Sequence, residues 1–267
     1  MFKFTIIKNN YKNTDDLAKT LKKVLLDNNN IFDEINPQYI FIIGGDGTFL
    51  KTVQQFQDKL SEIIFIPFKS GGSGYYTNKN EIEDISNILT QINNKSYNII
   101  SYELIEILND KKTNFVCNEV KILNEIKPTS IKIFINDEYL ETFWGTGLVV
   151  STSSGSTGYI KSINGAVILS KTNRLFQLQE IAPINTNKYR SLNSSIILSD
   201  EFSIKLEFKN YGKTMICDTK PYEILSNFIE IKSSLKKANV LVCKDQTLLS
   251  EIQILRDIFI KDKETIE

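Results

Sequence analysis

Asp46 lies in a glycine-rich run, Gly44–Thr48 (Gly-Gly-Asp-Gly-Thr), which follows the continuously apolar segment 39–43 and precedes a helical pattern. Glycines let backbone N–H groups approach a phosphate, and the start of a helix adds a positive dipole. A carboxylate would repel a phosphate there, so Asp46 needs another task, either holding a cation or taking a proton from a hydroxyl. The structural alternative is a helix N-cap, which aspartate fills well. The spacing of a GxxxxGK[ST] phosphate loop is absent.

Two further segments carry groups suited to a nucleotide. Asn118 and Glu119 lie near the end of a predicted strand, where a carboxylate can accept the protons of a ribose diol and an amide can read a base. Residues 147–166 run from an apolar strand through a loop rich in Ser, Thr and Gly into a predicted helix, which suits phosphate or sugar oxygens. Alone, the dipeptide is better explained as exposed strand residues, and the loop equally well as an ordinary capped turn.

The composition limits the chemistry further. The 267 residues include no histidine, which removes mechanisms with an imidazole base, and three separated cysteines without CxxC spacing, which indicate neither zinc nor a disulfide framework. Lys+Arg and Asp+Glu are equal at 32 each, so the basic excess typical of nucleic-acid binding is missing. No signal-peptide pattern and no apolar run of membrane-spanning length is present. We therefore expect a cytoplasmic protein that binds neither nucleic acid nor a membrane.

The elements that must position Asp46 come from an alternation of strand and helix patterns. Strands are predicted at 2–7, 39–43 and 63–67, and helices at 14–28, after Gly47 and at 80–93. Thr14 or Asp15 would cap the first helix. Such an alternation is typical of βαβ units around a parallel sheet. We expect residues 1–98 to form an α/β domain that carries the glycine-rich run.

The pattern changes near residue 98 to short strands separated by turn signals, among them Asn109-Asp110 and Asn136-Asp137. The predicted strands are 99–108, 114–123, 130–135, 139–143, 147–152, 195–199, 202–208, 213–217, 228–232 and 239–243. One helix is expected from near Thr157 to beyond Ala166. Residues 99–245 are thus predicted to form an all-β, sandwich-like domain. Residues 246–267 would contain a C-terminal helix over 246–260, with Leu248 and Leu249 on its apolar face, which could pack back on the first domain.

Together, these segments resemble the NAD kinase family. Gly44–Thr48 is similar to the family's GGDGT motif, Asn118-Glu119 to its NE motif, and residues 152–159 (Thr-Ser-Ser-Gly-Ser-Thr-Gly-Tyr) to its TPTGSTAY-type segment. Order and separation also match, and residues 179–190 resemble the stretch that follows in the family. The likeness covers about residues 39–220. The GGDGT motif alone is shared with diacylglycerol and sphingosine kinases, whereas the combination is specific.

The resemblance implies a fold like that of NAD and diacylglycerol kinases, and phosphoryl transfer from ATP or polyphosphate to the adenosine 2′-hydroxyl of NAD, giving NADP. Asp46 would be the catalytic base, and a divalent cation, expected to be Mg²⁺, would neutralise the transferring group. No residue is assigned as a metal ligand. The implied nucleotide-binding residues are Gly44, Gly45, Gly47, Thr48, Tyr75, Asn118, Glu119, Thr146, Ser154, Thr157, Gly158, Tyr159, Ser162 and Ala182.

Within that set, the resemblance implies particular roles. The glycines of the Gly44–Thr48 run would lie against phosphates, and Glu119 would hold a ribose. Ser154, Thr157, Gly158 and Tyr159 would line the adenosine side of the pocket, with Ala182 touching it. Tyr75, in a loop that stands where the family has a GHLGF-like run, would stack on the adenine. The substrates NAD and ATP would be the small-molecule partners, and the family implies a homodimer or homotetramer.

The chain departs from the family at four positions. Residues 143–147 (Phe-Trp-Gly-Thr-Gly) stand where the family commonly has FRGDG, so Trp144 replaces a cation and Thr146 an acid that helps bind the nucleotide across a subunit interface. Gly158 replaces the usual alanine and leaves more room near the base. Asp218-Thr219 replaces a common Asp-Gly turn.

Two alternatives stay open at this point. A lipid kinase that shares the GGDGT domain explains the first motif but neither Asn118-Glu119 nor the Thr157–Tyr159 segment, and no membrane-docking pattern is evident. A non-catalytic NAD sensor would explain Trp144 and Thr146, but it has no use for Asp46. ATP-dependent formation of NADP separates all three functions.

Overall fold

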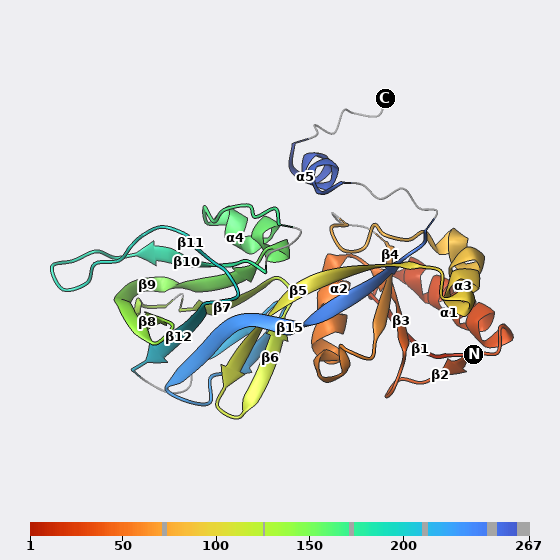
Figure 1. Cartoon of the computed structure of the whole chain (residues 1–267), viewed down its shortest axis with the longest axis horizontal. Helices are drawn as coiled ribbons and strands as arrows, with labels where there is room; N and C mark the ends of the chain where they lie inside the picture. Colours follow the sequence, from red (N-terminus) through yellow and green to blue (C-terminus); the bar gives the residue numbers. More distant parts are fainter. Residues whose placement is uncertain (71–73, 125, 171–173, 210–212, 245–249, 261–267) are drawn as a thin grey trace. The chain divides into compact units, whose positions relative to one another are not determined.

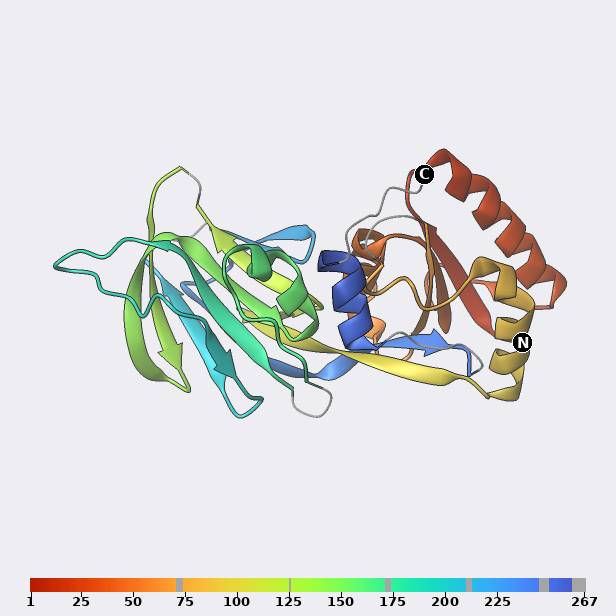
Figure 2. The ribbon, with the colours of Figure 1, turned by 90° about the horizontal axis from the view of Figure 1, so that it is seen from above.

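The computed structural model describes residues 1–70, 74–124, 126–170, 174–209, 213–244 and 250–260 (Figures 1 and 2). The chain divides into two compact units that interrupt each other in sequence. Unit 1 comprises Met1–Thr52, Glu62–Ser101 and Asn239–Glu267, and unit 2 comprises Val53–Ser61 and Tyr102–Ala238. Each unit is described by itself below.

Unit 1 is built on a parallel sheet. In chain order its elements are β1 (Lys3–Lys8), α1 (Lys12–Asp27), β2 (Ile31–Phe32), β3 (Tyr39–Gly44), α2 (Asp46–Gln55, whose last turn belongs to unit 2), β4 (Ile64–Lys69), α3 (Ile85–Asn94) and α5 (Glu251–Phe259). The strand order is β2-β1-β3-β4, and Asn239 and Val240 at the end of β15 (Phe228–Val242) pair with Ile64 and Phe65 of β4. Every one of these pairings is parallel, as the sequence predicts.

Helices cover both faces of the β3 strand, which explains why segment 39–43 is continuously apolar. On one face α1 and α3 pack through Leu25 and Ile88 against a cluster that includes Phe41 (Figure 1). On the other face Phe49 of α2 contacts Phe65 of β4 edge to face, with ring centroids 5.7 Å apart. A parallel strand that is buried on both faces carries apolar side chains on both, so its sequence does not alternate between apolar and polar residues.

Two details of unit 1 differ from the prediction. The first helix begins at Lys12 with Tyr11 at the N-cap, and neither Thr14 nor Asp15 caps it. Thr14 is instead buried inside the first turn, where its hydroxyl donates to the carbonyl of Tyr11 at 2.6 Å. The tail helix α5 is capped by Ser250, which forms a capping box with Gln253. Leu248 and Leu249 of the predicted tail helix lie outside the described residues.

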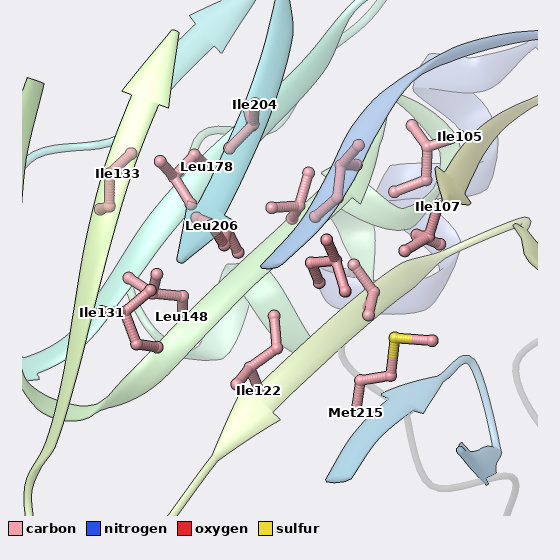
Figure 3. Packing of buried hydrophobic residues seen from close by; sticks show 14 of the residues in the cluster. Ile105, Ile107, Ile122, Ile131, Ile133, Leu148, Leu178, Ile204, Leu206 and Met215 are labelled. Carbon is pink, nitrogen blue, oxygen red and sulfur yellow. The ribbon is translucent and has the colours of Figure 1, made fainter. Parts of the chain in front are cut away.

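Unit 2 is almost entirely antiparallel β-structure. Its strands are β5 (Asn98–Asn109), β6 (Lys112–Val116), β7 (Glu119–Leu123), β8 (Thr129–Ile135), β9 (Glu138–Thr152), β10 (Phe176–Pro183), β11 (Ile196–Leu198), β12 (Ser203–Phe208), β13 (Thr214–Cys217), β14 (Lys220–Glu223) and the first part of β15. The main order is β14-β13-β7-β9-β8-β12-β15, while β10 pairs with β9 and β11, and β5 pairs with β15 and β6. Figure 3 shows Ile122, Ile133 and Leu206 within the apolar core that these strands enclose.

The hairpin turns confirm the turn prediction, whereas the strand breaks partly differ. Asn136 and Asp137 have φ angles of 48° and 64° and join β8 to β9, as a two-residue hairpin loop requires. The predicted strands 139–143 and 147–152 are one strand, β9. Within this strand Gly147 allows the close approach of β7, because a Cβ there would lie 2.2 Å from the carbonyl oxygen of Ile122. Likewise, 228–232 and 239–243 are one strand, β15.

Three further corrections concern the part of unit 2 that carries the motifs. The predicted strand 114–123 is two strands, β6 and β7, with a break at 117–118. The strands β10 and β14 were not predicted. The helix expected from Thr157 to beyond Ala166 is a 3-10 turn, Ser154–Thr157, followed by the single turn α4 (Tyr159–Ser162). It ends there because Asn164 adopts a φ of 66°.

The described helices include none that is both long and apolar enough to cross a membrane.

Candidate active site

Asp46 is the first residue of α2, directly beyond the carboxyl end of β3. Its two carboxylate oxygens accept hydrogen bonds from the backbone N–H groups of Tyr75 and Tyr76, each at 2.9 Å, and the hydroxyl of Thr77 lies 3.3 Å from Oδ1. These bonds come from the segment after β4 and not from the first turn of α2. Asp46 is therefore oriented by a neighbouring loop, and the N-cap alternative does not describe its side chain.

The segment that holds Asp46 is itself anchored. Tyr76 is buried and stacks on Phe49 of α2, with ring centroids 4.8 Å apart. Gly74 has a φ of 78°, and a Cβ there would lie 2.9 Å from the Lys69 side chain, so this turn needs glycine. Tyr75 is half-buried and meets the ring of Tyr76 edge to face. The first three residues of the glycine-rich loop, 71–73, lie outside the described residues.

The glycines next to Asp46 differ in what surrounds them. A Cβ on Gly44 would lie 2.4 Å from the hydroxyl of Thr48, so this position keeps space for that side chain. A Cβ on Gly47 would meet no atom within 4 Å, and the residue is exposed at the start of α2. The backbone of Gly47 is therefore open to a ligand, as the phosphate role implied for the run requires.

Lys79 is a buried cation near Asp46 that the sequence did not reveal. Only 5% of the residue is exposed. Burial lowers the pKa of its ammonium group, while the carboxylates of Asp46 and of Glu251 in α5 act against that shift. A lysine between two asparagines has the pattern of a surface residue, so no sequence signal pointed to it.

In unit 2, Asn118 and Glu119 stand at the break between β6 and β7. The carbonyl of Asn118 accepts hydrogen bonds from the backbone of Thr152 at 2.9 Å and from the hydroxyl of Ser151 at 3.1 Å, both at the end of β9. A Cβ on Gly155 would lie 2.2 Å from the same carbonyl oxygen, so the loop after β9 rests directly on this dipeptide.

Glu119 is 5% exposed, and its Oε2 atom has no hydrogen-bond partner among the described residues. Burial raises the pKa of this carboxyl group to about 7; the ammonium group of Lys121, 3.5 Å from Oε1, lowers it, and the carboxylate of Asp218 raises it. A buried polar atom without a partner is costly unless a ligand satisfies it. Near neutral pH this group can therefore switch between accepting and donating hydrogen bonds.

The Ser/Thr/Gly loop places its residues beside that carboxyl group. A Cβ on Gly158 would lie 3.3 Å from Oε2 of Glu119 and 3.5 Å from Nδ2 of Asn118, so Gly158 packs closely against both side chains and a larger residue would crowd them. The Thr157 hydroxyl donates to the carbonyl of Ser154 at 3.1 Å. In α4 the Ser162 hydroxyl donates to the carbonyl of Tyr159 at 2.6 Å, and the ammonium group of Lys121 lies 4.9 Å from the Tyr159 ring.

Thr146 and Ala182 form a second group, on the paired strands β9 and β10. The register places them between the pairs Gly145–Pro183 and Gly147–Ile181. Thr146 is five residues from Ser151 along β9, which corresponds to about 17 Å of strand. Ala182 is exposed, has a φ of 45°, and lines a cavity of about 730 Å³.

Trp144, the departure from the family that the sequence left unexplained, now has a partner. Its ring stacks on Tyr189, with centroids 5.4 Å apart and the planes at 16°. The backbone at Trp144 also accepts a hydrogen bond of 2.7 Å from the N–H of Ile184. The indole therefore covers an aromatic ring of the 184–189 segment, which accounts for an aromatic side chain in place of a cation.

Comparisons with known proteins cover both units. Residues 8–97 match the family model of the ATP-NAD kinase N-terminal domain, and residues 114–242 match that of the ATP-NAD kinase C-terminal domain. The NAD kinase of Lactobacillus gasseri is 35% identical over 205 residues, which are 74% of this chain and 76% of that protein. NAD kinase 1 of Bacillus cereus is 32% identical over 202 residues, which are 73% and 76% of the two chains.

Solved structures agree on the fold. The crystal structure of yeast NADH kinase complexed with NADH matches with a TM-score of 0.77 at 14% identity, covering 96% of this chain and 86% of that one. The NAD kinase from Archaeoglobus fulgidus in complex with ATP matches with a TM-score of 0.69 at 18% identity, covering 91% and 94%. These likenesses confirm the predicted fold class, an α/β part followed by a β-rich part.

All of these relatives are NAD or NADH kinases by name, so neither a lipid kinase nor a non-catalytic sensor is favoured. Both domain models match in the expected order, and a relative 35% identical is matched over 76% of its length. The chain belongs to the NAD kinase family.

Proposed function

We propose that the protein is a kinase that phosphorylates NAD at its adenosine 2′-hydroxyl, with ATP or polyphosphate as the donor, giving NADP. The observation that carries this proposal is the placement of Asp46 at the start of α2, with both carboxylate oxygens held by backbone N–H groups. A fixed carboxylate beside a helix N-terminus can take a proton while the N–H groups of that helix face the donor phosphates. Asp46 is therefore the proposed general base.

In the proposed reaction the 2′-oxygen forms a bond to the terminal phosphorus of the donor. The bond from that phosphorus to the bridging oxygen breaks, and ADP or the shortened polyphosphate leaves. The hydroxyl proton passes to Asp46. The transition state is loose, so positioning and charge neutralisation matter more than covalent help, and a chain without histidine can supply both. Mg²⁺ enters with ATP as part of the substrate, where it neutralises charge on the transferring group.

The proposed nucleotide-binding roles are those that the family resemblance implies, and observations in each unit support them. Oε2 of Glu119, buried and without a partner, would accept a ribose hydroxyl, and the amide of Asn118 would read the base. Gly158 packs directly against both groups and would line the pocket beside them. In unit 1, Tyr75 would stack on the adenine and the exposed backbone of Gly47 would face a phosphate. The predicted division into residues 1–98, 99–245 and 246–267 remains part of the proposal.

The proposed assembly is a homodimer or homotetramer. Support comes from Thr146, which stands where the family resemblance places an acid that binds the nucleotide across a subunit interface, and from the exposed Ala182 on the paired strand β10. Light scattering at micromolar concentration is expected to give a multiple of the 30.6 kDa chain mass, and a monomer would refute this. The proposed location is the cytoplasm, and three buried free cysteines are in keeping with a reducing compartment.

The test is NADP formation by the purified protein with NAD, Mg²⁺ and ATP, beside Asp46→Asn. We expect the wild type to turn over and the variant to lose on the order of a hundredfold or more of kcat, as removal of a general base does. The matched control is Asp16→Asn, an aspartate on α1 whose side chain is 87% exposed, which should keep wild-type activity.

Polyphosphate in place of ATP completes the experiment, because either donor is compatible with the site. NAD binding without turnover on both donors would refute the kinase proposal. Full activity in Asp46→Asn would leave the kinase standing and remove the general-base role.

A further inference from the structure

Asp218 is a buried carboxylate that contacts the Asn118–Glu119 backbone. It lies in the tight turn between β13 and β14, has a φ of 50°, and is 4% exposed. Its Oδ1 accepts hydrogen bonds from the backbone N–H groups of Asn118 at 2.7 Å and Glu119 at 3.2 Å. Its Oδ2 accepts from the N–H of Cys117 at 3.0 Å. One side chain thus binds three consecutive N–H groups.

These N–H groups depend on Asp218 because they lie where the sheet ladder is interrupted. β6 ends at Val116 and β7 begins at Glu119, so the N–H groups of Cys117 and Asn118 fall between the two strands. Buried backbone donors without partners are strongly unfavourable. The contact is also reciprocal, since the N–H of Asp218 donates to the carbonyl of Glu119 at 2.9 Å.

A fourth donor fixes the carboxylate itself. Nε2 of Gln54, a residue 3% exposed at the end of α2, lies 3.2 Å from Oδ2 of Asp218 and also donates to the carbonyl of Phe115. Oε1 of the same amide accepts the hydroxyl proton of Tyr222 at 3.1 Å. Both ends of the Gln54 amide are therefore used, which sets its orientation and that of Asp218.

The simpler explanation is that Asp218 only makes the turn, because Asp and Asn tolerate positive φ angles. That role needs no carboxylate, and burying one without compensation is costly. Asp137, in the β8–β9 turn, shows the difference, since it has a φ of 64° and a solvent-exposed side chain. At Asp218 four donors converge on a buried carboxylate, so the side chain has a task that the turn does not explain.

We propose that Asp218 is a positioning residue for the nucleotide substrate. By binding the backbone N–H groups of residues 117–119, it would hold the side chains of Asn118 and Glu119 facing the nucleotide. This inference rests on the proposed function, because it assumes that Glu119 binds the nucleotide as a carboxylate.

The groups around Glu119 come from three directions. Two of them carry charge, Lys121 on its own strand and Asp218 in the β13–β14 turn. The third is uncharged: Ser151 faces Glu119 from the paired strand β9, and β13 presents Cys217, whose thiol pKa is raised by burial. Burial raises the pKa of Asp218 to about 6 against the lowering effect of its hydrogen bonds, so it is mostly ionised at neutral pH. Its charge then makes Glu119 harder to ionise.

The test is Asp218→Asn, which keeps the shape but presents an amide NH₂ to donors. We expect the Kd for NAD to rise on the order of tenfold or more, since at least one buried donor loses its acceptor. We also expect the pH at which NAD binding reaches half of its maximum to move downward, because a negative neighbour of Glu119 is gone. Calorimetric titration of NAD between pH 5.5 and pH 8.5 (about one and a half pH units either side of the pKa of Glu119) measures both.

A purely structural role would weaken binding and leave that pH unchanged, so an unmoved midpoint overturns the proposal. Asp137→Asn is the matched control and should bind NAD as the wild type does. If Asp218→Asn does not fold, Gln54→Met takes its place. It removes one donor to Asp218, so the Kd should rise severalfold, and an unchanged Kd overturns the proposal. Because the readout is binding, a wild type that binds NAD but forms no NADP refutes the kinase activity alone.

Discussion

The Glu119 carboxyl group links substrate binding to pH at the scale of one residue. Its pKa of about 7 in the folded protein stands against 4.5 for an unperturbed glutamate. Between these two values the folded state holds a proton that the unfolded state has released. Folding stability from this group is therefore full below about pH 4.5 and is lost as pH rises through 7. Nucleotide binding is expected to run in the opposite direction, because a ribose hydroxyl donates a stronger hydrogen bond to the ionised carboxylate than to the protonated group.

Glu119→Gln should separate the two effects. The amide cannot ionise, so the Tm of the variant relative to wild type should be higher at pH 8 than at pH 5. Its affinity for NAD should fall at pH 8, where the wild-type carboxylate is charged. Thermal melts at the two pH values and a binding titration check this. A Tm difference that does not change with pH would contradict the shifted pKa.

The buried ammonium group of Lys79 is expected to lower the stability of the fold while its positive charge favours activity. An ammonium group buried near Asp46 is costly to desolvate, although the carboxylates of Asp46 and Glu251 offset part of the cost. We expect Lys79→Met to raise the Tm at neutral pH by a few degrees and to lower kcat, because the positive charge near Asp46, the proposed general base, is lost. The exposed Lys23→Met on α1 is the control for both measurements. A lower Tm in Lys79→Met would show that the ammonium group stabilises the fold.

At the scale of elements, two glycines test which loops hold the site and which admit a ligand. A Cβ on Gly155 overlaps the carbonyl oxygen of Asn118, whereas one on Gly47 meets no atom within 4 Å. Gly155→Ala should therefore lower the Tm and raise the KM for NAD together, since Asn118 must move. Gly47→Ala should leave the Tm unchanged and reduce activity, because the new methyl group meets only the substrate. Melts and steady-state kinetics on both variants decide this, and a Gly47→Ala enzyme with full activity would rule out phosphate contact there.

Patterns that depend on local sequence predicted most elements correctly. The apolar segment 39–43, the helix after Gly47 and the Asn136-Asp137 turn follow from residue type and spacing alone. The errors came where a long-range contact decides the structure. The break predicted between 143 and 147 is absent, because β9 stays paired with β8 and β10 through these residues, and the strand predicted over 114–123 is broken where Asp218, about a hundred residues later, accepts hydrogen bonds from the N–H groups.

The residues of the candidate site, like the helices and strands, were predicted only in part from the sequence. Asp46, Asn118 and Glu119 came from motifs, and the structure places Asn118 and Glu119 beside Gly158 as a group. Gln54 and Lys79 carried no motif, because their importance comes from burial and from partners distant in sequence.

At the scale of the whole molecule, the sequence order and the compact units do not coincide. Unit 1 takes its last strand from the end of β15, and the Asn80 amide donates to the carbonyl of Leu241 at 2.8 Å. Leu241 and Cys243 also belong to the apolar core that includes Phe41 and Ile88. The α/β part therefore depends on residues more than a hundred positions after its other strands.

A fragment of residues 1–101 should consequently fail to fold alone. It would leave one edge of β4 unpaired and open a gap where Leu241 packs. We expect aggregation or a broad, non-cooperative thermal transition by circular dichroism. The same fragment joined by a short linker to residues 239–260 should melt cooperatively. A cooperative transition in the shorter fragment would contradict this dependence.

The stack of Trp144 on Tyr189 has an optical consequence. The chain contains a single tryptophan, so its fluorescence arises from one place only, the paired strands that carry Thr146 and Ala182. The wavelength of maximum emission and the fluorescence intensity depend on the polarity around the indole. A second subunit or a nucleotide that binds against these strands would change both. Trp144, which departs from the family pattern, is thus an intrinsic fluorescence probe for the proposed subunit assembly and nucleotide binding at these strands.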